Sequence, residues 1–277
     1  MLRPLMVLLL TVAATACAST AGPAPTERPE TMPPSPSEPT GFLNRTVTVD
    51  GVTRRYVVYV PFDYTPHEAW PLILFFHGSG ERGGDGLLQT EVGLGSALRR
   101  HPERYPAIVV MPQCPAGRWW DAALPHVEAA LDAVEARYHI DPARRYLTGL
   151  SMGGYLAWSW GALHTERFAA IVPICGGGKP EDMQRLSEAP IADVFGTLEE
   201  RVAALAEVPI WAWHGSDDTV VPAFRSAAMV RLVEQAGGTV RYSELEDVGH
   251  NAWDPAYTNP LLPAWLFMQR KTATPPK

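Results

Sequence analysis

The pattern of apolar and polar residues changes near residue 60 of this 277-residue chain. In the segment RTVTVDGVTRRYVVYVP, residues 45–61, apolar and polar residues alternate on both sides of Asp50-Gly51. Alternation with a period of two is typical of a strand with one buried face, and Asp-Gly is a favoured hairpin turn. The segment therefore predicts an antiparallel β-hairpin at the start of the folded region.

The rest of the chain shows two other patterns. Five short apolar runs lack alternation, as expected for strands that are buried on both faces. Apolar residues at three- and four-residue spacing between several of these runs indicate helices. The runs are PLILFFHG, AIVVMPQC, RYLTGLS, AAIVPICGG and VPIWAWHG, and the helical segments span residues 124–138, 152–164, 222–238 and 260–271, with a last strand at 239–246. This order predicts an α/β fold with a mostly parallel, twisted sheet, helices on both faces and an N-terminal antiparallel hairpin.

The N-terminal residues predict export. Residues 1–16 have a positive start at Arg3, an apolar core at 5–13 that is too short to span a bilayer, and small residues before Cys17. Small residues before a cysteine resemble the bacterial lipoprotein signal and predict a lipidated Cys17, although Ala14 stands where that signal usually has Leu. Ordinary cleavage after ATA or ACA is the alternative. The protein is expected at the cell envelope as a lipoprotein or in secreted form.

The residues that follow differ in composition from the rest. Residues 17–40 are rich in Pro, Thr and Ser and show no apolar periodicity, so they predict a disordered tether. The folded domain is expected over residues 41–272. Its cysteines Cys114 and Cys175 follow strands that are not expected to be neighbours, and their pairing stays open.

Charge and composition exclude several functions. The formal net charge is −7 and no basic stripe is present, which argues against nucleic acid as a partner. We find no His/Cys cluster with metal-ligand spacing and no P-loop or dinucleotide fingerprint, so neither a metal nor another cofactor is expected. Membrane contact is expected only through the N-terminal lipid anchor.

The first stretch that indicates chemistry is GLSMG, residues 149–153. It matches the G-x-S-x-G nucleophile elbow and lies between a predicted strand and a predicted helix, as that motif requires. The turn is so sharp that a Cβ two residues before or after the serine would clash with neighbouring backbone. Ser151 is therefore the candidate nucleophile.

A nucleophilic serine needs a base and an acid that orients the base, in the chain order Ser, acid, His in this fold. His250 lies in a loop after the last predicted strand and fits that order. His77 and His214 each precede a glycine at a strand end and are expected to support a turn. His214 is the competing candidate for the base, but it lies before the acid and not after it. Two acids, Asp217 and Asp218, follow a strand end. Neighbouring side chains point in different directions, so only one of them should face His250.

The loop HGSGERGG, residues 77–84, follows another strand end. Its small residues allow backbone N–H groups to face a cavity, as an oxyanion hole requires. We expect the donors to be the amides of Ser79 and of Met152, the residue after the nucleophile.

Taken together, these motifs resemble bacterial α/β-hydrolase esterases. The branch is often labelled "predicted peptidase" or prolyl-oligopeptidase-like and is related more distantly to feruloyl esterases, polyhydroxybutyrate depolymerases and dienelactone hydrolases. The resemblance covers about residues 46–270 in the family's order. It rests on HGSGER, PQCP, RRYLTGLSMGGY, FAAIVPICGGG, HGSDDTVVP, GGTVRY and GVGHNAWDPAY.

This resemblance also distinguishes the two acids. Family members carry G-x-x-D-x-x-V after the strand, which matches Gly215, Asp218 and Val221 here. It implies Asp218 as the acid of a Ser-His-Asp triad and leaves Asp217 as a turn or helix-capping residue.

Two features bear on the substrate. Residues 176–207 are longer than one crossover helix needs and predict either a small cap beside the site or a plain surface helix. Trp119, Trp120 and Trp253 follow strand ends or flank His250, and they are candidates for a substrate pocket, with ordinary core packing as the alternative.

These observations predict a serine carboxylesterase that acts on a small-molecule or polymer-linked ester through an acyl-enzyme intermediate. A peptidase acting on small peptides is one alternative, but the residues before 41 are too few for the propeller that prolyl-oligopeptidases usually carry. A non-catalytic, surface-tethered binding module is the other, and a complete set of Ser151, Asp218 and His250 argues against it.

Overall fold

The computed structural model describes residues 38–271. The predicted signal at 1–16, Cys17 and nearly all of the predicted tether lie outside this range, as does residue 272. Within 38–271, no helix combines the length and the apolar character needed to cross a membrane.

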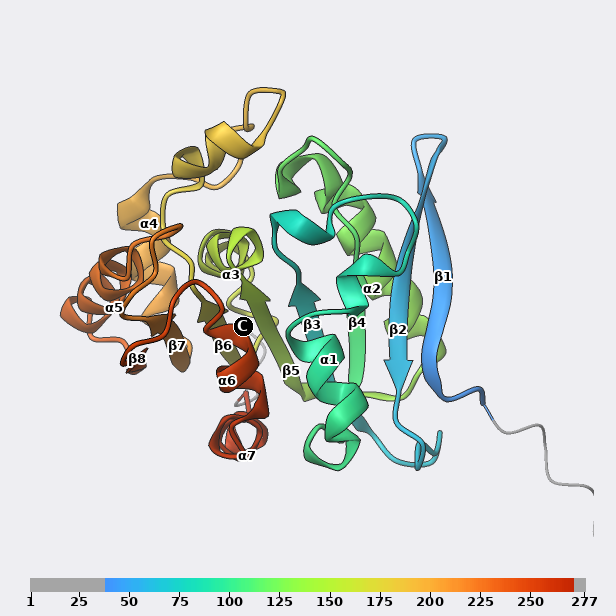
Figure 1. Ribbon diagram of the computed structural model, residues 1–277. Coiled ribbons are helices and arrows are strands. Elements are labelled where there is room, and N and C mark those ends of the chain that lie inside the picture. The colour runs from blue at the N-terminus through green and yellow to red at the C-terminus, as the bar shows by residue number, and fades with distance from the viewer. Residues whose placement is uncertain (1–37, 272–277) are drawn as a thin grey trace, which may run out of the picture. The chain divides into compact units, whose positions relative to one another are not determined.

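An eight-stranded sheet forms the centre of the molecule (Figure 1). Its spatial order is β1-β2-β4-β3-β5-β6-β7-β8, with antiparallel pairing at β1–β2 and β2–β4 and parallel pairing from β4 to β8. The predicted α/β fold with a mostly parallel sheet and a leading hairpin is confirmed. The strands are β1 Gly41–Val49, β2 Val52–Val60, β3 Trp70–Phe76, β4 Ile108–Pro112, β5 Ile140–Leu150, β6 Ala170–Ile174, β7 Ile210–Gly215 and β8 Val240–Leu245.

The hairpin turn has the backbone that its sequence predicts. Asp50 and Gly51 have φ angles of 49° and 76°, and the two strands pair without a register shift from Gly41–Val60 to Val49–Val52. Positive φ at both central residues belongs to the type I′ turn, whose twist matches that of the flanking strands.

Helices cover both faces of the sheet. Buried residues of α2, α3, α4 and α5 belong to one apolar cluster, and those of α1, α6 and α7 belong to another on the opposite face. The helices are α1 Leu94–Arg100, α2 Leu124–Arg137, α3 Met152–Leu163, α4 Leu198–Leu205, α5 Phe224–Gln235, α6 Trp253–Thr258 and α7 Leu261–Met268, and the short 3₁₀ helices are η1 Ser79–Glu81, η2 Leu88–Thr90, η3 Pro102–Arg104, η4 Trp120–Ala123 and η5 Pro180–Leu186.

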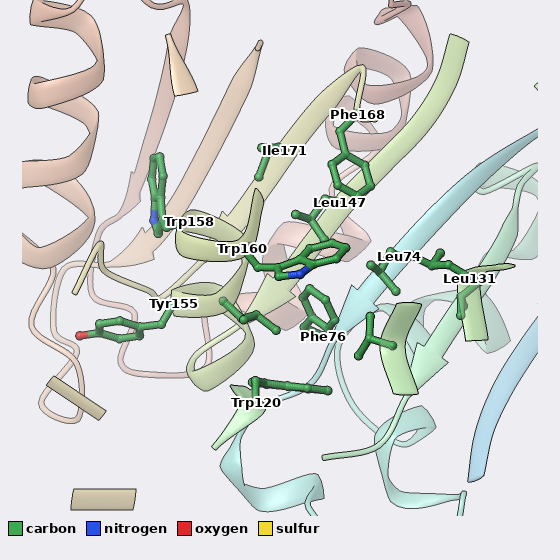
Figure 2. Packing of buried hydrophobic residues seen from close by; sticks show 14 of the residues in the cluster. Leu74, Phe76, Trp120, Leu131, Leu147, Tyr155, Trp158, Trp160, Phe168 and Ile171 are labelled. Atoms are coloured by element: carbon green, nitrogen blue, oxygen red, sulfur yellow. The ribbon is translucent and has the colours of Figure 1, made fainter. Parts of the chain in front are cut away.

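Aromatic side chains fix the end of β3 in the core (Figure 2). Phe76, the last residue of β3, has its ring centroid 4.9 Å from that of Trp120 and 5.7 Å from that of Trp160. All three side chains are buried. Truncating one such aromatic side chain typically costs about 3–5 kcal/mol of stability, so the loop that leaves β3 starts from a rigid point.

The inserted segment between β6 and β7 has little regular structure. It contains η5 and α4, and α4 begins with a capping box between Thr197 and Glu200. A cavity of about 440 Å³ lies within this segment, lined in part by Lys179, Phe195 and Arg201. The segment is therefore more than the single crossover helix that a parallel connection requires.

Both remaining cysteines are free and buried. Cys114 follows β4 and Cys175 follows β6, and β3 and β5 lie between those two strands. The question of pairing is thus answered by the topology. Burial raises the pKa of each thiol to about 12.

Candidate active site

Ser151 occupies a sharp turn between β5 and α3. Its φ of 51° and ψ of −115° are unusual for a residue with a side chain, and its N–H donates to the carbonyl of Ile174 at 2.8 Å. A Cβ on Gly149 would lie 2.3 Å from the Gly153 oxygen, and one on Gly153 would lie 2.1 Å from the Phe76 oxygen. Both glycines are therefore required by close backbone packing, as the motif predicts.

His250 lies between Ser151 and Asp218. Its Nε2 is 2.9 Å from Ser151 Oγ and its Nδ1 is 2.7 Å from Asp218 Oδ2. A carboxylate only accepts hydrogen bonds, so Nδ1 carries the proton and the lone pair of Nε2 faces the serine hydroxyl. The loop after β8 thus brings together three side chains that are far apart in the sequence.

The two neighbouring acids have different surroundings. Asp218 is 6% exposed, and its Oδ1 accepts from the amides of Val220 and Val221, both at 2.8 Å. Asp217 is exposed, and its Oδ1 accepts from the hydroxyl of Ser216. Only Asp218 faces the imidazole of His250.

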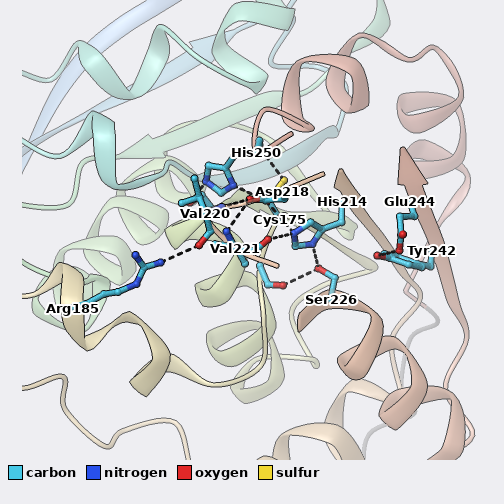
Figure 3. Close-up of polar contacts among 12 residues, drawn as sticks. Cys175, Arg185, His214, Asp218, Val220, Val221, Ser226, Tyr242, Glu244 and His250 are labelled. Carbon is cyan, nitrogen blue, oxygen red and sulfur yellow. Dashed lines mark hydrogen bonds and ion pairs between the residues drawn. The ribbon is translucent and has the colours of Figure 1, made fainter. Parts of the chain in front are cut away.

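A second imidazole, that of His214, also lies beside Asp218 (Figure 3). His214, the penultimate residue of β7, is fully buried, with Nε2 2.8 Å from the Val221 oxygen and 3.2 Å from Asp218 Oδ2. Its Nδ1 is 2.7 Å from Ser226 Oγ on α5. Burial lowers the pKa of His214, while the Val221 carbonyl and Asp218 act against that shift. We expected this residue to support a turn or to compete with His250 as the base, and the only sequence signal for its contact with Asp218 is its position four residues earlier.

The loop after β3 is oriented by His77. His77 Nδ1 is 2.6 Å from the Gly78 oxygen, and Nε2 accepts from the amide of Cys114 at 2.9 Å. Complete burial lowers the pKa of His77 to about 4, so the ring is neutral with its proton on Nδ1. In a trans peptide the C=O and N–H point in opposite directions. The Gly78 carbonyl faces His77, so the Ser79 N–H points away from that ring.

This loop lies directly beside the nucleophile. A Cβ on Gly78 would lie 3.6 Å from the Cβ of Ser151. Met152 is buried and opens α3, and amides in the first turn of a helix have no acceptor within that helix. The predicted donor residues Ser79 and Met152 thus belong to segments that flank Ser151.

Arginines attach the inserted segment to the loops around Ser151. Arg82 donates to the oxygens of Ser79 at 2.9 Å, of Arg118 at 3.1 Å and of Leu186 in the insertion. Arg185 donates to the Val220 oxygen at 3.2 Å, beside the loop of Asp218. Sequence reasoning did not identify these contacts, because an arginine that binds carbonyl groups has no motif.

The three tryptophans that we considered for a pocket lie in two environments. Trp119 and Trp120 are 0% exposed, and Trp119 packs edge-on against Phe195 of the insertion at 5.3 Å. Trp253 is partly exposed and meets the His250 ring edge-on at 5.2 Å. Of the three, only Trp253 presents surface beside His250.

One group of buried side chains in the described part of the chain has ligand atoms close enough for a metal ion. Cys175, His214 and Asp218 have ligand atoms within 4.8 Å of one another. However, both ring nitrogens of His214 and both oxygens of Asp218 already make hydrogen bonds, and the raised thiol pKa disfavours a thiolate. The group therefore suits the polar network better than a metal ion.

Comparison with known proteins finds similarity to esterases and depolymerases. No family model matches the chain. It is 24% identical over 222 residues to a poly(3-hydroxybutyrate) depolymerase of Ralstonia pickettii, covering 70% of this chain and 45% of that protein. It is 28% identical over 129 residues to a probable feruloyl esterase C of Aspergillus terreus, covering 45% of this chain and 47% of that protein. The chain spans less than half the length of the curated relatives that it matches.

A solved structure supports the same grouping. The crystal structure of a thermostable esterase is 33% identical, superposes with a TM-score of 0.71, and covers 83% of this chain and 63% of that one. The chain therefore has the α/β-hydrolase fold, and its homologues include polyhydroxybutyrate depolymerases and feruloyl esterases.

Proposed function

We propose that this chain, an α/β-hydrolase by fold and similarity, is a serine carboxylesterase with Ser151, His250 and Asp218 as its catalytic triad. The observation that carries the proposal is the unbroken hydrogen-bonded chain from the Ser151 hydroxyl through His250 to Asp218. A strained turn that presents a serine hydroxyl to an imidazole is the arrangement that activates this hydroxyl for attack on a carbonyl.

In the first half-reaction, Ser151 Oγ attacks the ester carbonyl carbon while its proton passes to His250 Nε2. The carbonyl oxygen becomes an oxyanion, for which the amides of Ser79 and Met152 are the proposed donors. Asp218 stabilises the imidazolium. The tetrahedral intermediate then collapses, His250 protonates the leaving alcohol, and the acyl group remains on Ser151.

In the second half-reaction, water takes the place of the alcohol. His250 removes a proton from the water, whose oxygen attacks the acyl carbon. The second tetrahedral intermediate releases the carboxylic acid, and the proton on His250 returns to Ser151 Oγ. The cycle needs only the side chains and amides of this chain, the ester and water.

We propose a carboxylic ester as substrate, either a small molecule or an ester attached to a polymer. The similarity to a depolymerase and to a feruloyl esterase supports both kinds, since one name denotes a polyester and the other an aromatic acyl group. Trp253, beside His250, is the proposed aromatic contact for the acyl group.

Hydrolysis of p-nitrophenyl esters tests this function. Acyl chains from acetyl to palmitoyl, together with methyl ferulate and a polyhydroxybutyrate suspension, report the size of the acyl pocket. Ser151→Ala should lower kcat by at least about 10⁴-fold, because the nucleophile is removed.

Ser159→Ala is the matched control. Ser159 lies on α3, the helix that follows Ser151, and it is also buried. Among the described residues its hydroxyl bonds to the Tyr155 oxygen alone, so this variant should keep most of the activity. A folded wild-type protein that hydrolyses peptide p-nitroanilides but no ester would contradict the esterase and support the peptidase. A protein that hydrolyses neither would be a binding module.

We further propose that the catalytic domain begins near residue 41 and is exported, with Cys17 as the lipid-modified residue. Support comes from the charged start, the apolar core and the small residues before that cysteine. Labelling with a fatty-acid analogue in a bacterial host should mark the wild type and not Cys17→Ser.

A further inference from the structure

Four N–H groups face the carboxylate of Asp218 at 2.7–3.2 Å. Two backbone amides bind Oδ1, and two imidazoles, those of His250 and His214, approach Oδ2 at 2.7 and 3.2 Å. A carboxylate has about four lone-pair sites, so its capacity is filled. The triad as proposed above uses only one of the two imidazoles.

The partners of His214 determine where its proton lies. The Val221 carbonyl and the Asp218 carboxylate are both acceptors, and both face Nε2. Nε2 must therefore carry a proton, since two acceptors facing a bare lone pair would repel it. On the other side of the ring, Nδ1 lies 2.7 Å from the Ser226 hydroxyl oxygen, and that hydroxyl donates its own proton to the Gly176 oxygen.

His214 is also anchored more firmly than His250. It belongs to β7, inside the sheet, and its side chain is fully buried, whereas the side chain of His250 is 20% exposed on a loop. Ser226 on α5, 2.7 Å from His214 Nδ1, lies 2.8 Å from the Gly176 oxygen after β6. The second imidazole therefore connects the acid to the rigid part of the fold.

We propose that His214 is a positioning residue for Asp218: its Nε2–H holds Oδ2 in the orientation in which Oδ2 accepts from His250 Nδ1–H. The inference rests on the proposed esterase function for its kinetic consequence, but the hydrogen-bonding arrangement can be tested without any activity. The proposed unit thus runs Ser151–His250–Asp218–His214.

One imidazole alone is insufficient to fix the Asp218 carboxylate, because the carboxylate can rotate about its bond to Cβ. The amides of Val220 and Val221 hold Oδ1, but Oδ2 would then be held only by His250, the residue that it must orient. The Nε2–H of His214, on the sheet, holds Oδ2 independently of His250. The titratable groups that face His214 are Asp218, His250 and Cys175, from the loops after β7, β8 and β6.

The kinetic test uses two variants of His214. Gln can place an amide N–H near the position of Nε2, and Leu cannot. We expect His214→Leu to lower kcat about 10- to 100-fold with KM nearly unchanged, since a misplaced triad affects the chemical step. His214→Gln should restore most of the loss. In His214→Leu, the acid limb of the kcat/KM profile should move to lower pH, because the His250 imidazolium loses part of its carboxylate partner.

An NMR measurement tests the arrangement independently. In wild-type protein with ¹⁵N-labelled histidine, the His214 ring should carry a proton on Nε2, and the His250 Nδ1–H should show the deshielding of a bond to a carboxylate. The His250 signal should shift in His214→Leu and stay close to wild type in His214→Gln.

Several outcomes would overturn the proposal. A His214 ring whose Nε2 carries no proton in the wild type does so even if no variant folds. A folded His214→Leu with unchanged kcat and an unchanged His250 signal also does so. If Ser151→Ala shows that the protein is not an esterase, the proposed function fails, whereas the NMR result still decides the role of His214.

Discussion

The nucleophile elbow and the inserted segment 176–207 both contribute to the surroundings of Ser151, but different forces hold them. At the elbow, backbone packs on backbone so closely that a Cβ on Gly149, Gly153 or Gly154 would lie 2.1–2.3 Å from a carbonyl oxygen. The insertion is attached mostly by side chains: arginines bind carbonyls or a carboxylate, and Phe195 packs on Trp119. Main-chain contacts thus hold the elbow, whereas side chains hold most of the insertion.

This difference determines which of the two regions can change in sequence. Backbone contacts at van der Waals distance have no flexible atom that could move aside, so the elbow accepts almost no substitution. Side-chain contacts to carbonyls can be lost one at a time, each at a modest cost. We therefore expect the nucleophile to be fixed by the fold, while the inserted segment can diverge and alter which esters enter.

The largest effect should come from Gly153→Ala. The new methyl group would lie 2.1 Å from the Phe76 oxygen, at the end of a strand that core aromatics hold in place. We expect a loss of at least about 3 kcal/mol in the free energy of unfolding, together with loss of ester hydrolysis. Urea denaturation measures the first and the ester assay the second.

Gly80→Ala is its matched control, because a Cβ at Gly80 would meet nothing within 4 Å. That variant lies in the loop of the proposed oxyanion hole and should be nearly as stable as wild type. Equal stability of the two alanine variants would contradict the claim that close backbone packing at the elbow excludes a Cβ.

A pH effect of intermediate size should come from His77. Its folded-state pKa of about 4 lies below the unfolded value of 6.5, so the unfolded chain binds more protons between these two values. Stability is then fully present above pH 6.5 and falls as the pH drops toward 4, by up to about 3 kcal/mol for this group.

The difference between wild type and His77→Asn isolates this contribution, since Asn can keep a donor near Nδ1. Unfolding free energies measured from pH 7 to 4 should decline less steeply in the variant. The same substitution at the exposed His67 should leave the slope as in wild type. Parallel slopes for wild type and His77→Asn would show that His77 is protonated in the folded protein.

The smallest effect on stability should come from Arg82→Gln. Arg82 connects the loop after β3 to the inserted segment. The variant loses the contacts from Arg82 to the Ser79, Arg118 and Leu186 oxygens. We expect a loss of about 1–2 kcal/mol in stability and a roughly tenfold lower kcat/KM, because the loop that carries the proposed Ser79 donor loses an anchor.

Arg55→Gln controls for the removal of an arginine, since Arg55 is exposed and, within residues 38–271, its side chain bonds to the Asp85 oxygen alone. It should change neither quantity measurably. An Arg82→Gln variant with wild-type kcat/KM would mean that the oxyanion loop does not depend on the insertion.

The sequence predicted the features that follow from periodicity and from short motifs. Alternation located the hairpin, apolar runs located the parallel strands, and GLSMG located the elbow at Ser151. The sequence predicted less well which side chains in irregular loops face the site. Neither periodicity nor spacing distinguished Asp217 from Asp218, and family resemblance was needed for that choice.

The contacts that periodicity could not predict are those in which a side chain binds a distant carbonyl or carboxylate. His214 meets Asp218 only because the loop after β7 folds back, and Arg82 reaches Leu186 across more than a hundred residues of sequence. The burial of Trp119 and Trp120 depends on the packing of Phe76 and Phe195 around them. Such partners are set by tertiary structure and leave no local pattern.

The backbone angle at Ser151 has an evolutionary consequence. A residue other than glycine at φ 51° carries a cost of roughly 1–2 kcal/mol, which glycine would avoid. Selection for heat resistance alone would favour glycine at this codon and would abolish the hydroxyl. Directed evolution of this protein toward higher melting temperature thus needs a simultaneous screen for turnover. Without that screen, selection would favour replacing Ser151, which the proposed chemistry requires.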